Sequence, residues 1–128
     1  MTMTIDPDCF DGEPVEWLHF VGRLNSEECV AQYARTDALI FPSLLESYGL
    51  PLVEAMSIGM PIIAADLPYA HVLCGDEGIY FDPKSEHSLA EAIALLKKKL
   101  SLGWLPDWGH ALKALPQSWD EVARFFVR

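Results

Sequence analysis

The sequence predicts an α/β fold in which a parallel sheet of about four strands carries helices on both faces. Four short runs rich in β-branched and aromatic residues support the strands, at 15–21, 38–42, 61–66 and 78–83. Helical patterns lie between most of these runs, and such alternation implies right-handed crossovers and parallel pairing. Continuous apolar runs are typical of strands that helices cover on both sides.

The first two helices are predicted from residues that are typical of helix ends. Asn25 is the expected N-cap of a helix within 25–36, and Glu28 three positions later completes a capping box. The second helix is predicted at 51–59, because Pro51 suits the first turn of a helix and Gly59 suits its end.

The third helix is the longest, at 85–100, with Ser85 as its cap and apolar residues on one stripe. Glycines and prolines then interrupt residues 101–117, which we expect to form loops. A closing helix is predicted from Ser118, with Glu121 as its capping-box partner. We therefore expect residues 1–128 to form one partial domain, an α/β core at 15–100 followed by a loop and closing helix at 101–128.

Composition excludes several classes of function. The chain is 51% apolar with a formal charge of −10, which fits a globular core and argues against nucleic acid as a partner, since that binding relies on Lys and Arg. The basic cluster Lys97–Lys99 is interpreted as a helix end. No apolar stretch approaches the roughly 20 residues that span a bilayer, and no signal peptide is visible, so we expect a cytoplasmic protein.

Cysteine and histidine positions predict neither a disulfide framework nor a metal site. Cys9, Cys29 and Cys74 are odd in number and widely spaced. His71 and Cys74 are three apart and could share a helical face, but two ligands do not complete a metal site, so we interpret both as packing residues.

The strongest chemical signal is the strand–loop–helix junction over residues 41–56. Ligands of α/β sheets bind where strands end and helices begin. Backbone amides from Tyr48 to Leu50 would point outward from a positive helix end that suits a diphosphate, and Gly49 allows a close approach. Glu54 lies among apolar neighbours, so we expect a buried carboxylate that needs hydrogen-bond donors, such as vicinal sugar hydroxyls. The alternative is that Glu54 only favours the helix dipole and that Glu46 is a solvated loop residue.

The same stretch resembles a known family, the retaining nucleotide-sugar glycosyltransferases of family 4 (glycosyl transferases group 1), which have two Rossmann-like domains in the GT-B arrangement. The resemblance covers roughly residues 17–126 and is to the C-terminal, donor-binding domain. It is carried by Asp37, Pro42-Ser43, Glu46, Gly49-Leu50-Pro51, Glu54-Ala55-Met56, Gly59, Pro61 and Asp66.

This resemblance implies roles for individual residues. Glu54 would hold the ribose of the donor nucleotide, and Glu46 would lie near the donor sugar and diphosphate as the candidate catalytic residue. Ser47, Tyr48, Gly49 and Leu50 would line the donor site. The transfer would retain anomeric configuration without a metal or cofactor, because basic side chains and the helix end take up the charge of the leaving diphosphate. A two-carboxylate glycosidase is a poor analogy, since its carboxylates flank the scissile bond in a different geometry.

Relatives of this kind also carry an acceptor-binding domain and an opening βαβ unit with basic residues for the diphosphate, which this sequence lacks. Arg23 lies too close to Pro42-Ser43 to replace that arginine, so we interpret it as structural. We therefore expect a truncated donor-binding domain, inactive alone and acting with a separate acceptor-binding domain or chain. The alternative is a non-catalytic nucleotide-sugar-binding or assembly module.

Two further expectations concern related folds and assembly. A flavodoxin-like receiver or dinucleotide domain is disfavoured, because no Gly-rich loop follows the first strand. The strand run at 15–21 would lie at an edge of the sheet without its usual partner, and the apolar side of the closing helix would need a cover. Both features predict a homodimer or larger assembly.

Overall fold

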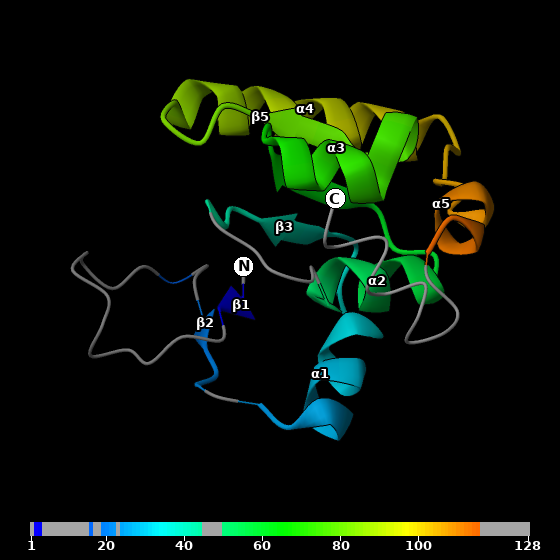
Figure 1. The fold of residues 1–128 in the computed structure, drawn as a ribbon. Helices are drawn as coiled ribbons and strands as arrows, with labels where there is room; N and C mark the ends of the chain where they lie inside the picture. The colour runs from blue at the N-terminus through cyan, green and yellow to red at the C-terminus, as the bar shows by residue number, and fades with distance from the viewer. Residues whose placement is uncertain (1, 4–15, 17–18, 23, 45–49, 116–128) are drawn as a thin grey trace. The chain divides into compact units, whose positions relative to one another are not determined.

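The computed structural model describes residues 2–3, 16, 19–22, 24–44 and 50–115. The chain forms two compact units, Met1–Thr36 and Asp37–Arg128, and each is described by itself. Figure 1 labels the helices and strands in chain order. The closing helix predicted from Ser118 and the interpretation of Arg23 both lie outside the described residues.

The first unit contains a small sheet and one helix. Strand β1 (Thr2–Met3) pairs in parallel with β2 (His19–Phe20). Helix α1 (Ser26–Tyr33) has the predicted capping box: the amide of Glu28 donates to Asn25 Oδ1 at 2.8 Å, and the Asn25 amide donates to Glu28 Oε2 at 3.2 Å. The reciprocal bonds satisfy two amides that a helix start leaves without intrahelical partners.

The second unit is built on a parallel three-stranded sheet in the order β3–β4–β5. Its strands are β3 (Leu39–Phe41), β4 (Ile62–Ala65) and β5 (Ile79–Phe81). The α/β class is confirmed, but the prediction of about four strands in one sheet was wrong for the described residues. The run at 15–21 supplies only β2, whose partner is β1, because apolar patterning marks a strand without specifying what it pairs with.

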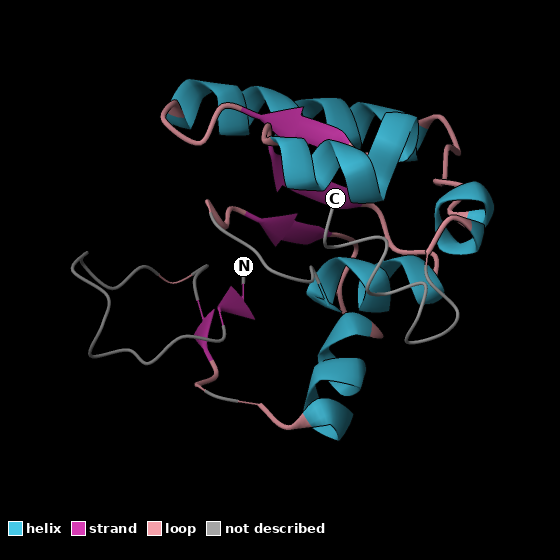
Figure 2. Ribbon diagram, in the orientation of Figure 1, coloured by secondary structure: helices cyan, strands magenta, loops and turns pink. Residues whose placement is uncertain are grey.

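Helices follow each strand of the second unit. They are α2 (Leu50–Ser57), α3 (Pro68–Cys74) and α4 (Glu86–Ser101), with a 3₁₀ turn at Gly75–Glu77 after α3 and a short α5 (Gly109–Lys113). Figure 2 shows helices on both sides of these strands, as predicted. Helix α4 has its predicted cap, since the Ser88 amide donates to Ser85 Oγ at 3.1 Å.

Two helices depart from the sequence prediction. Helix α3 was missed because its N-cap, Leu67, makes no side-chain capping bond, so its only start signal is Pro68 in the first turn. Helix α5 lies in the segment expected to be loop, and its cap Trp108 likewise offers no capping bond. Both helices are short and stabilised by tertiary contacts, which local signals do not report.

The core of the second unit lies on both faces of β4, whose four residues are fully buried. One face packs against α4, in a cluster comprising Ile63, Ala65, Ile79, Phe81, Ala92 and Leu96. Alternation along the strand turns Ile62 and Ala64 to the opposite face, where α2 and α3 pack. The continuous apolar β4 is therefore covered by helices on both faces, as its sequence predicted, and it is the central strand of the three.

Candidate functional site

The carboxyl ends of the three parallel strands form one edge of the sheet, and α2, α3 and α4 follow β3, β4 and β5 in the chain. The strands are in register, with Phe41 opposite Ala64 and Ala65 opposite Phe81. Residues leaving this edge are Ser43 after β3, Asp66 after β4 and Asp82 after β5. Ligands of such sheets bind outside this edge, which we call the strand-exit edge.

Most of the predicted site residues lie in the connection from β3 to α2. Glu46, Ser47, Tyr48 and Gly49 lie outside the described residues. Leu50 is the first residue of α2, and Glu54 follows in the second turn, about 6 Å further along the helix axis. Helix α2, which carries Glu54, thus follows β3 in the chain.

The expectation that the Glu54 side chain is buried was wrong, because Glu54 is exposed. Helix α2 buries Leu52, Ala55 and Met56, each no more than 2% exposed. Glu54 belongs to the outward side with Ser57, whose hydroxyl donates to the Glu54 backbone carbonyl at 2.7 Å. A helix that is apolar in sequence nearly all round still presents one side to solvent, and packing determines which side.

Exposure of Glu54 changes the argument for its role. A buried carboxylate would require internal donors, whereas an exposed one is open to a ligand that arrives from water. A carboxylate has two oxygens and can accept hydrogen bonds from two neighbouring hydroxyls at once. Glu54 can therefore still accept hydrogen bonds from sugar hydroxyls. The argument that a buried carboxylate requires such donors no longer applies.

The strand-exit edge also contains a bond that the sequence did not indicate. The Tyr69 hydroxyl on α3 donates to the backbone carbonyl of Ser43 at 2.5 Å, across 26 positions of sequence. The ring of Tyr69 also lies edge-on to Phe41 of β3, with ring centroids 6.3 Å apart. Pro68 could have indicated that a helix starts here. The bond itself depends on how that helix packs, which the local sequence does not indicate.

A second group of side chains follows the end of β4. His71 Nε2 lies 2.5 Å from Asp66 Oδ1, and both side chains are about half exposed. The His71 ring stacks on Tyr80 of β5, with centroids 3.8 Å apart, and the Tyr80 hydroxyl donates to the Gly75 carbonyl at 2.6 Å. Burial is the main reason why the pKa of Tyr80 is raised above its ordinary value, with contributions from nearby Cys74, Asp76 and Asp66.

Cys74 is a packing residue, as the sequence predicted. Its side chain is 1% exposed, and burial raises the pKa of the thiol to about 12. His71, three positions earlier, is exposed. Among the described residues, no three His, Cys, Asp or Glu side chains come together where they could hold a metal ion.

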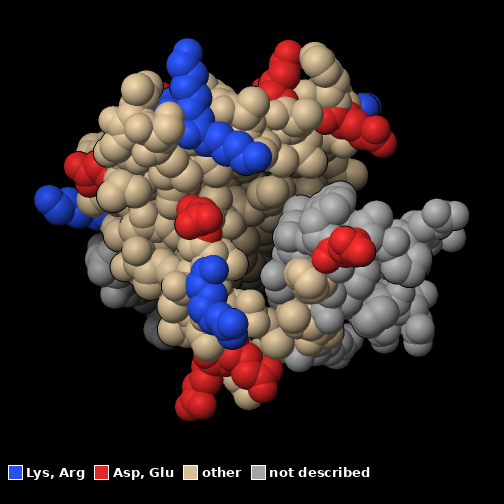
Figure 3. Space-filling view, turned by 180° about the vertical axis from the view of Figure 1, so that it is seen from behind, with Lys and Arg blue, Asp and Glu red and all other residues tan. Residues whose placement is uncertain are grey.

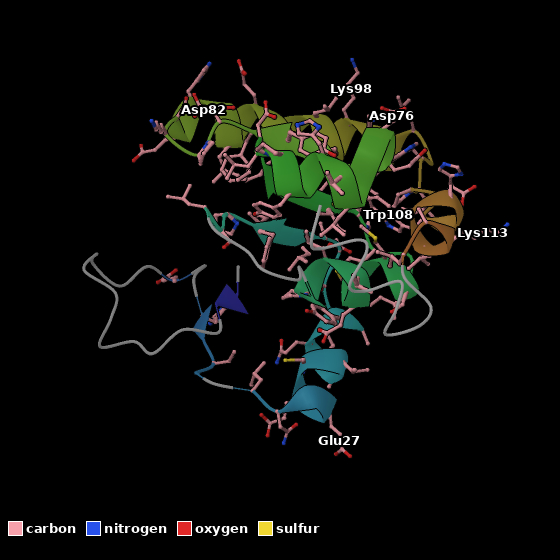
Figure 4. All side chains as sticks on the ribbon, in the orientation of Figure 1. Glu27, Asp76, Asp82, Lys98, Trp108 and Lys113 are labelled. Carbon is pink, nitrogen blue, oxygen red and sulfur yellow. The ribbon has the colours of Figure 1, made fainter. Side chains whose placement is uncertain are left out.

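The basic cluster Lys97–Lys99 lies in the last turns of α4, as predicted, far along the helix from the strand-exit edge. Figure 4 labels Asp82 and Lys98 toward opposite ends of this helix. Lys99 Nζ lies 4.6 Å from the centre of the Trp104 ring, which is a cation–π contact. On the face shown in Figure 3, acidic and basic side chains of the described residues are scattered and form no continuous basic surface.

Comparison with protein families identifies one match that includes the whole strand-exit edge. The family model described as glycosyl transferases group 1 matches residues 15–101. That range includes the candidate residues from Glu46 to Glu54 and all three strands of the second unit. In the part of the chain that the structure describes, no helix is long and apolar enough to cross a membrane.

Two curated relatives are bacterial mannosyltransferases. The chain is 30% identical over 77 residues to the O-antigen chain mannosyltransferase B of Escherichia coli, covering 60% of this chain and 20% of the relative. It is 26% identical over 123 residues to the O-antigen chain mannosyltransferase RfbU of Salmonella typhimurium, covering 96% of this chain and 30% of the relative. The chain thus spans less than a third of either relative.

A solved structure shares the fold. The sucrose-phosphate synthase of Thermosynechococcus elongatus superposes with a TM-score of 0.58 and 26% sequence identity. The match covers 85% of this chain and 26% of that protein. The fold is therefore the Rossmann-like arrangement of the GT-B type that the sequence resemblance predicted.

Proposed function

This chain belongs to the glycosyl transferases group 1 family, and from this membership we propose that it binds a nucleotide-diphosphate sugar, the donor for retaining glycosyl transfer. The observation that carries the proposal is the position of Glu54. Glu54 lies within the matched range and has an exposed side chain on α2, the helix that follows β3 in the chain. Ligands of parallel α/β sheets bind where strands end and helices begin.

We propose that the ribose of the donor hydrogen-bonds to Glu54. Two vicinal hydroxyls would donate to the carboxylate, and hydrogen bonds to charged groups are stronger than neutral ones. The amino-terminal end of α2 offers backbone amides and a partial positive charge to the diphosphate. Ser47, Tyr48, Gly49 and Leu50 would complete this part of the donor site, by resemblance to the family.

Glu46 is proposed as the residue beside the donor sugar. In retaining transfer the diphosphate leaves with negative charge, so groups that stabilise this charge contribute to the rate. The helix end provides such stabilisation from the protein itself, and the proposal requires no metal or organic cofactor. Glu46 is assigned to positioning and electrostatics at the sugar, not to a defined nucleophilic step.

The sugar and acceptor classes follow from the relatives. Both curated relatives described above are named O-antigen mannosyltransferases, so we propose a mannosyl donor and a role in polysaccharide synthesis with a saccharide or lipid acceptor. An acceptor-binding domain or chain is the proposed partner. A cytoplasmic location, assembly into oligomers and inactivity of the 128 residues alone stay predictions.

Isothermal titration calorimetry on the purified chain tests donor binding. The panel contains guanosine, uridine and adenosine diphosphates together with their mannose and glucose conjugates. We expect one diphosphate to bind best and the corresponding monophosphate to bind more weakly, because the helix end contacts the diphosphate. A folded chain that binds no member of the panel at millimolar concentration would contradict the proposal.

A further inference from the structure

Helix α4 carries a second group of leucines that does not face the core. Leu96 is buried in the second unit, whereas Leu95, the residue before it, is exposed. Positions 95, 98, 99 and 102 have the i, i+3, i+4, i+7 spacing that places side chains on one face of a helix. Leu102, which caps the helix, is 77% exposed. This outer face of α4 therefore presents two leucines with Lys98 and Lys99 between them.

The turn that follows α4 adds two more apolar residues beside this face. Gly103 has a φ of +81°, and its amide donates to the Leu100 carbonyl at 3.0 Å. The Trp104 amide donates to the Lys99 carbonyl, also at 3.0 Å, and the two bonds together form a Schellman motif. The turn thereby holds the Trp104 ring against Lys99, in the cation–π contact described above. Leu105 comes next and is 69% exposed.

These residues form one surface, which we call the α4 exit patch: Leu95, Lys98, Lys99, Leu102, Trp104 and Leu105. Single exposed leucines are ordinary on protein surfaces and require no explanation. Here, however, three of the seven large apolar side chains that are exposed in the described part of the chain lie within one patch. The other four lie one each on α1, after β3, after α2 and on α3. The clustering, and not the exposure of any one leucine, indicates a docking surface.

The charge of the patch is opposite to that of the whole chain. The formal net charge is −10, yet three of the nine Lys and Arg residues are consecutive at Lys97–Lys99. Figure 4 shows Lys98 on the side of α4 that faces away from the sheet. At physiological ionic strength, charges more than about 8 to 10 Å away are largely screened, so a partner at the patch responds mainly to these lysines.

Acidic residues limit the patch at both ends. Glu91 lies one turn before it on the same face of α4, with a carboxylate oxygen 3.0 Å from His87 Nε2. Asp107 lies two positions after it, and its carboxylate accepts a hydrogen bond from the Gly109 amide at 3.0 Å. Among the described residues, neither carboxylate forms an ion pair with a lysine of the patch. The positive charge of the patch is therefore local and not neutralised by these neighbours.

We propose that the α4 exit patch docks on the surface of a bilayer that contains anionic lipids. Lys98 and Lys99 would contact the headgroups, while Leu102 and Leu105 would enter the boundary between headgroups and acyl chains. The indole of Trp104 suits the same depth. An anionic bilayer matches both features of the patch, because it offers negative charge with an apolar layer directly beneath it. The patch contains no residue of the proposed donor site, so this inference does not depend on the proposed function.

Flotation of the 128-residue chain with vesicles tests the proposal at neutral pH and physiological salt, without any nucleotide. One set of vesicles contains phosphatidylcholine alone, and the other contains about 40% phosphatidylglycerol. We expect the chain to float with the anionic vesicles and not with phosphatidylcholine alone, because the exposed leucines are too few to hold it without the lysines. Equal recovery with both kinds of vesicle, or recovery with neither, would overturn the proposal.

The charge of the patch is tested by Lys98→Gln, with Lys84→Gln as its matched control. Both lysines are exposed, and Lys84 lies before the start of α4, outside the patch. Lys98→Gln should weaken binding to the anionic vesicles about 5-fold, the effect of one lysine near such a surface. Lys84→Gln has the same net charge and should match the wild type. An equal loss in both variants would show that net charge, and not the patch, determines binding.

The apolar part is tested by Leu102→Ser combined with Leu105→Ser. Binding should fall about 10-fold or more, because two side chains no longer enter the apolar layer. Val72→Ser is the control, since Val72 is similarly exposed on α3 and lies outside the patch. Thermal melts should show all variants folded, because none of these side chains is buried. Full binding by the double variant would overturn the role of the leucines.

Light scattering coupled to size exclusion, without lipid, tests a second copy of the chain as the occupant instead. We expect the combined Leu102→Ser and Leu105→Ser variant to have the same molecular mass in solution as the wild type. If the wild type is an oligomer that this variant converts to a monomer, and the wild type does not float with anionic vesicles, the patch is an interface between copies and the proposal is overturned.

Discussion

The indole of Trp108 donates a hydrogen bond of 2.8 Å to the backbone carbonyl of Met60, across 48 positions of sequence. Trp108 is 3% exposed and precedes α5, while Met60 lies between α2 and β4. Figure 4 labels Trp108 beside the start of α5. The Trp108 side chain thus links the segment after α4 to the residues that precede β4, the central strand.

Replacement of Trp108 should therefore destabilise the second unit. Trp108→Phe loses the hydrogen bond and some packing, which we expect to lower the free energy of unfolding by at least about 1 kcal/mol. Trp108→Ala should lower it by about 3 to 5 kcal/mol, the range for large aromatic truncations in cores. Urea unfolding followed by circular dichroism measures both. Trp104→Phe, at a partly exposed ring, is the control, and an equal loss in that variant would contradict a special role for Trp108.

The end of α2 depends on the backbone of Gly59, which has a φ of +75°. A side chain at this position would meet no atom within 4 Å, so the penalty for substitution is conformational and not steric crowding. Gly59→Ala should cost about 1 to 2 kcal/mol of stability, because left-handed backbone is unfavourable for L-residues. Gly59→Asn should cost less, since Asn tolerates this conformation better. Thermal melts of the two variants check the order, and equal stability of Ala and Asn variants would contradict it.

Local signals predicted the elements whose ends are determined by nearby residues. Asn25 and Ser85 cap their helices with their own side chains, so the sequence around each cap was sufficient. Helix α3 was missed because Leu67 provides no such bond. The pairing of β1 with β2 was also missed, because pairing depends on contacts between segments that a strand's own pattern does not encode.

Local sequence patterns also predicted part of the candidate site. The strand–loop–helix junction and the position of Glu54 on α2 follow from local patterns. The exposure of Glu54 does not, because the burial of Leu52, Ala55 and Met56 determines which side of the helix faces solvent. The bond between Tyr69 and Ser43 depends on helix packing across 26 positions and has no local signal.

Burial of Cys74 predicts a pH dependence of stability. The thiol keeps its proton in the folded chain up to a pKa of about 12, whereas its ordinary value is 9.0. Between these values the unfolded chain binds fewer protons, so the free energy of unfolding falls as pH rises. Below about pH 9 this contribution is fully present. The raised pKa of Tyr80 acts in the same direction.

Urea unfolding of the wild type and Cys74→Ala at pH 8, 9, 10 and 11 tests this dependence. The decline with pH should be shallower in Cys74→Ala, because the buried thiol no longer contributes. The remaining decline includes the contribution of Tyr80. Parallel pH dependences of the two proteins would contradict the assignment to Cys74.

The same burial predicts slow chemical modification. Thiolate is the reactive form of cysteine, and Cys74 is both inaccessible and protonated at neutral pH. Iodoacetamide at pH 8 should label Cys74 only after unfolding, while the partly buried Cys29 should react faster in the native chain. Peptide mass spectrometry distinguishes the two sites. Rapid native labelling of Cys74 would show that α3 opens far more readily than its burial indicates.

The final prediction concerns the carboxylate of Glu54. Glu54→Gln preserves shape and removes the charge, so it should weaken binding of the preferred nucleoside diphosphate about 5- to 15-fold, near the lower end expected for hydrogen bonds to charged groups because Glu54 is exposed. The stability of the variant should change little, since the side chain is not part of the core. Glu91→Gln is the control, because Glu91 is an exposed carboxylate within α4, beyond its first turn.

Comparison with a 2′-deoxyribose diphosphate tests whether Glu54 contacts the ribose. This ligand should bind the wild type more weakly than the ribose form does, and the two forms should bind Glu54→Gln with nearly equal affinity. If the wild type and Glu54→Gln lose the same factor on removal of the 2′-hydroxyl, Glu54 does not contact the ribose, and the alternative that the carboxylate only favours the helix dipole is left.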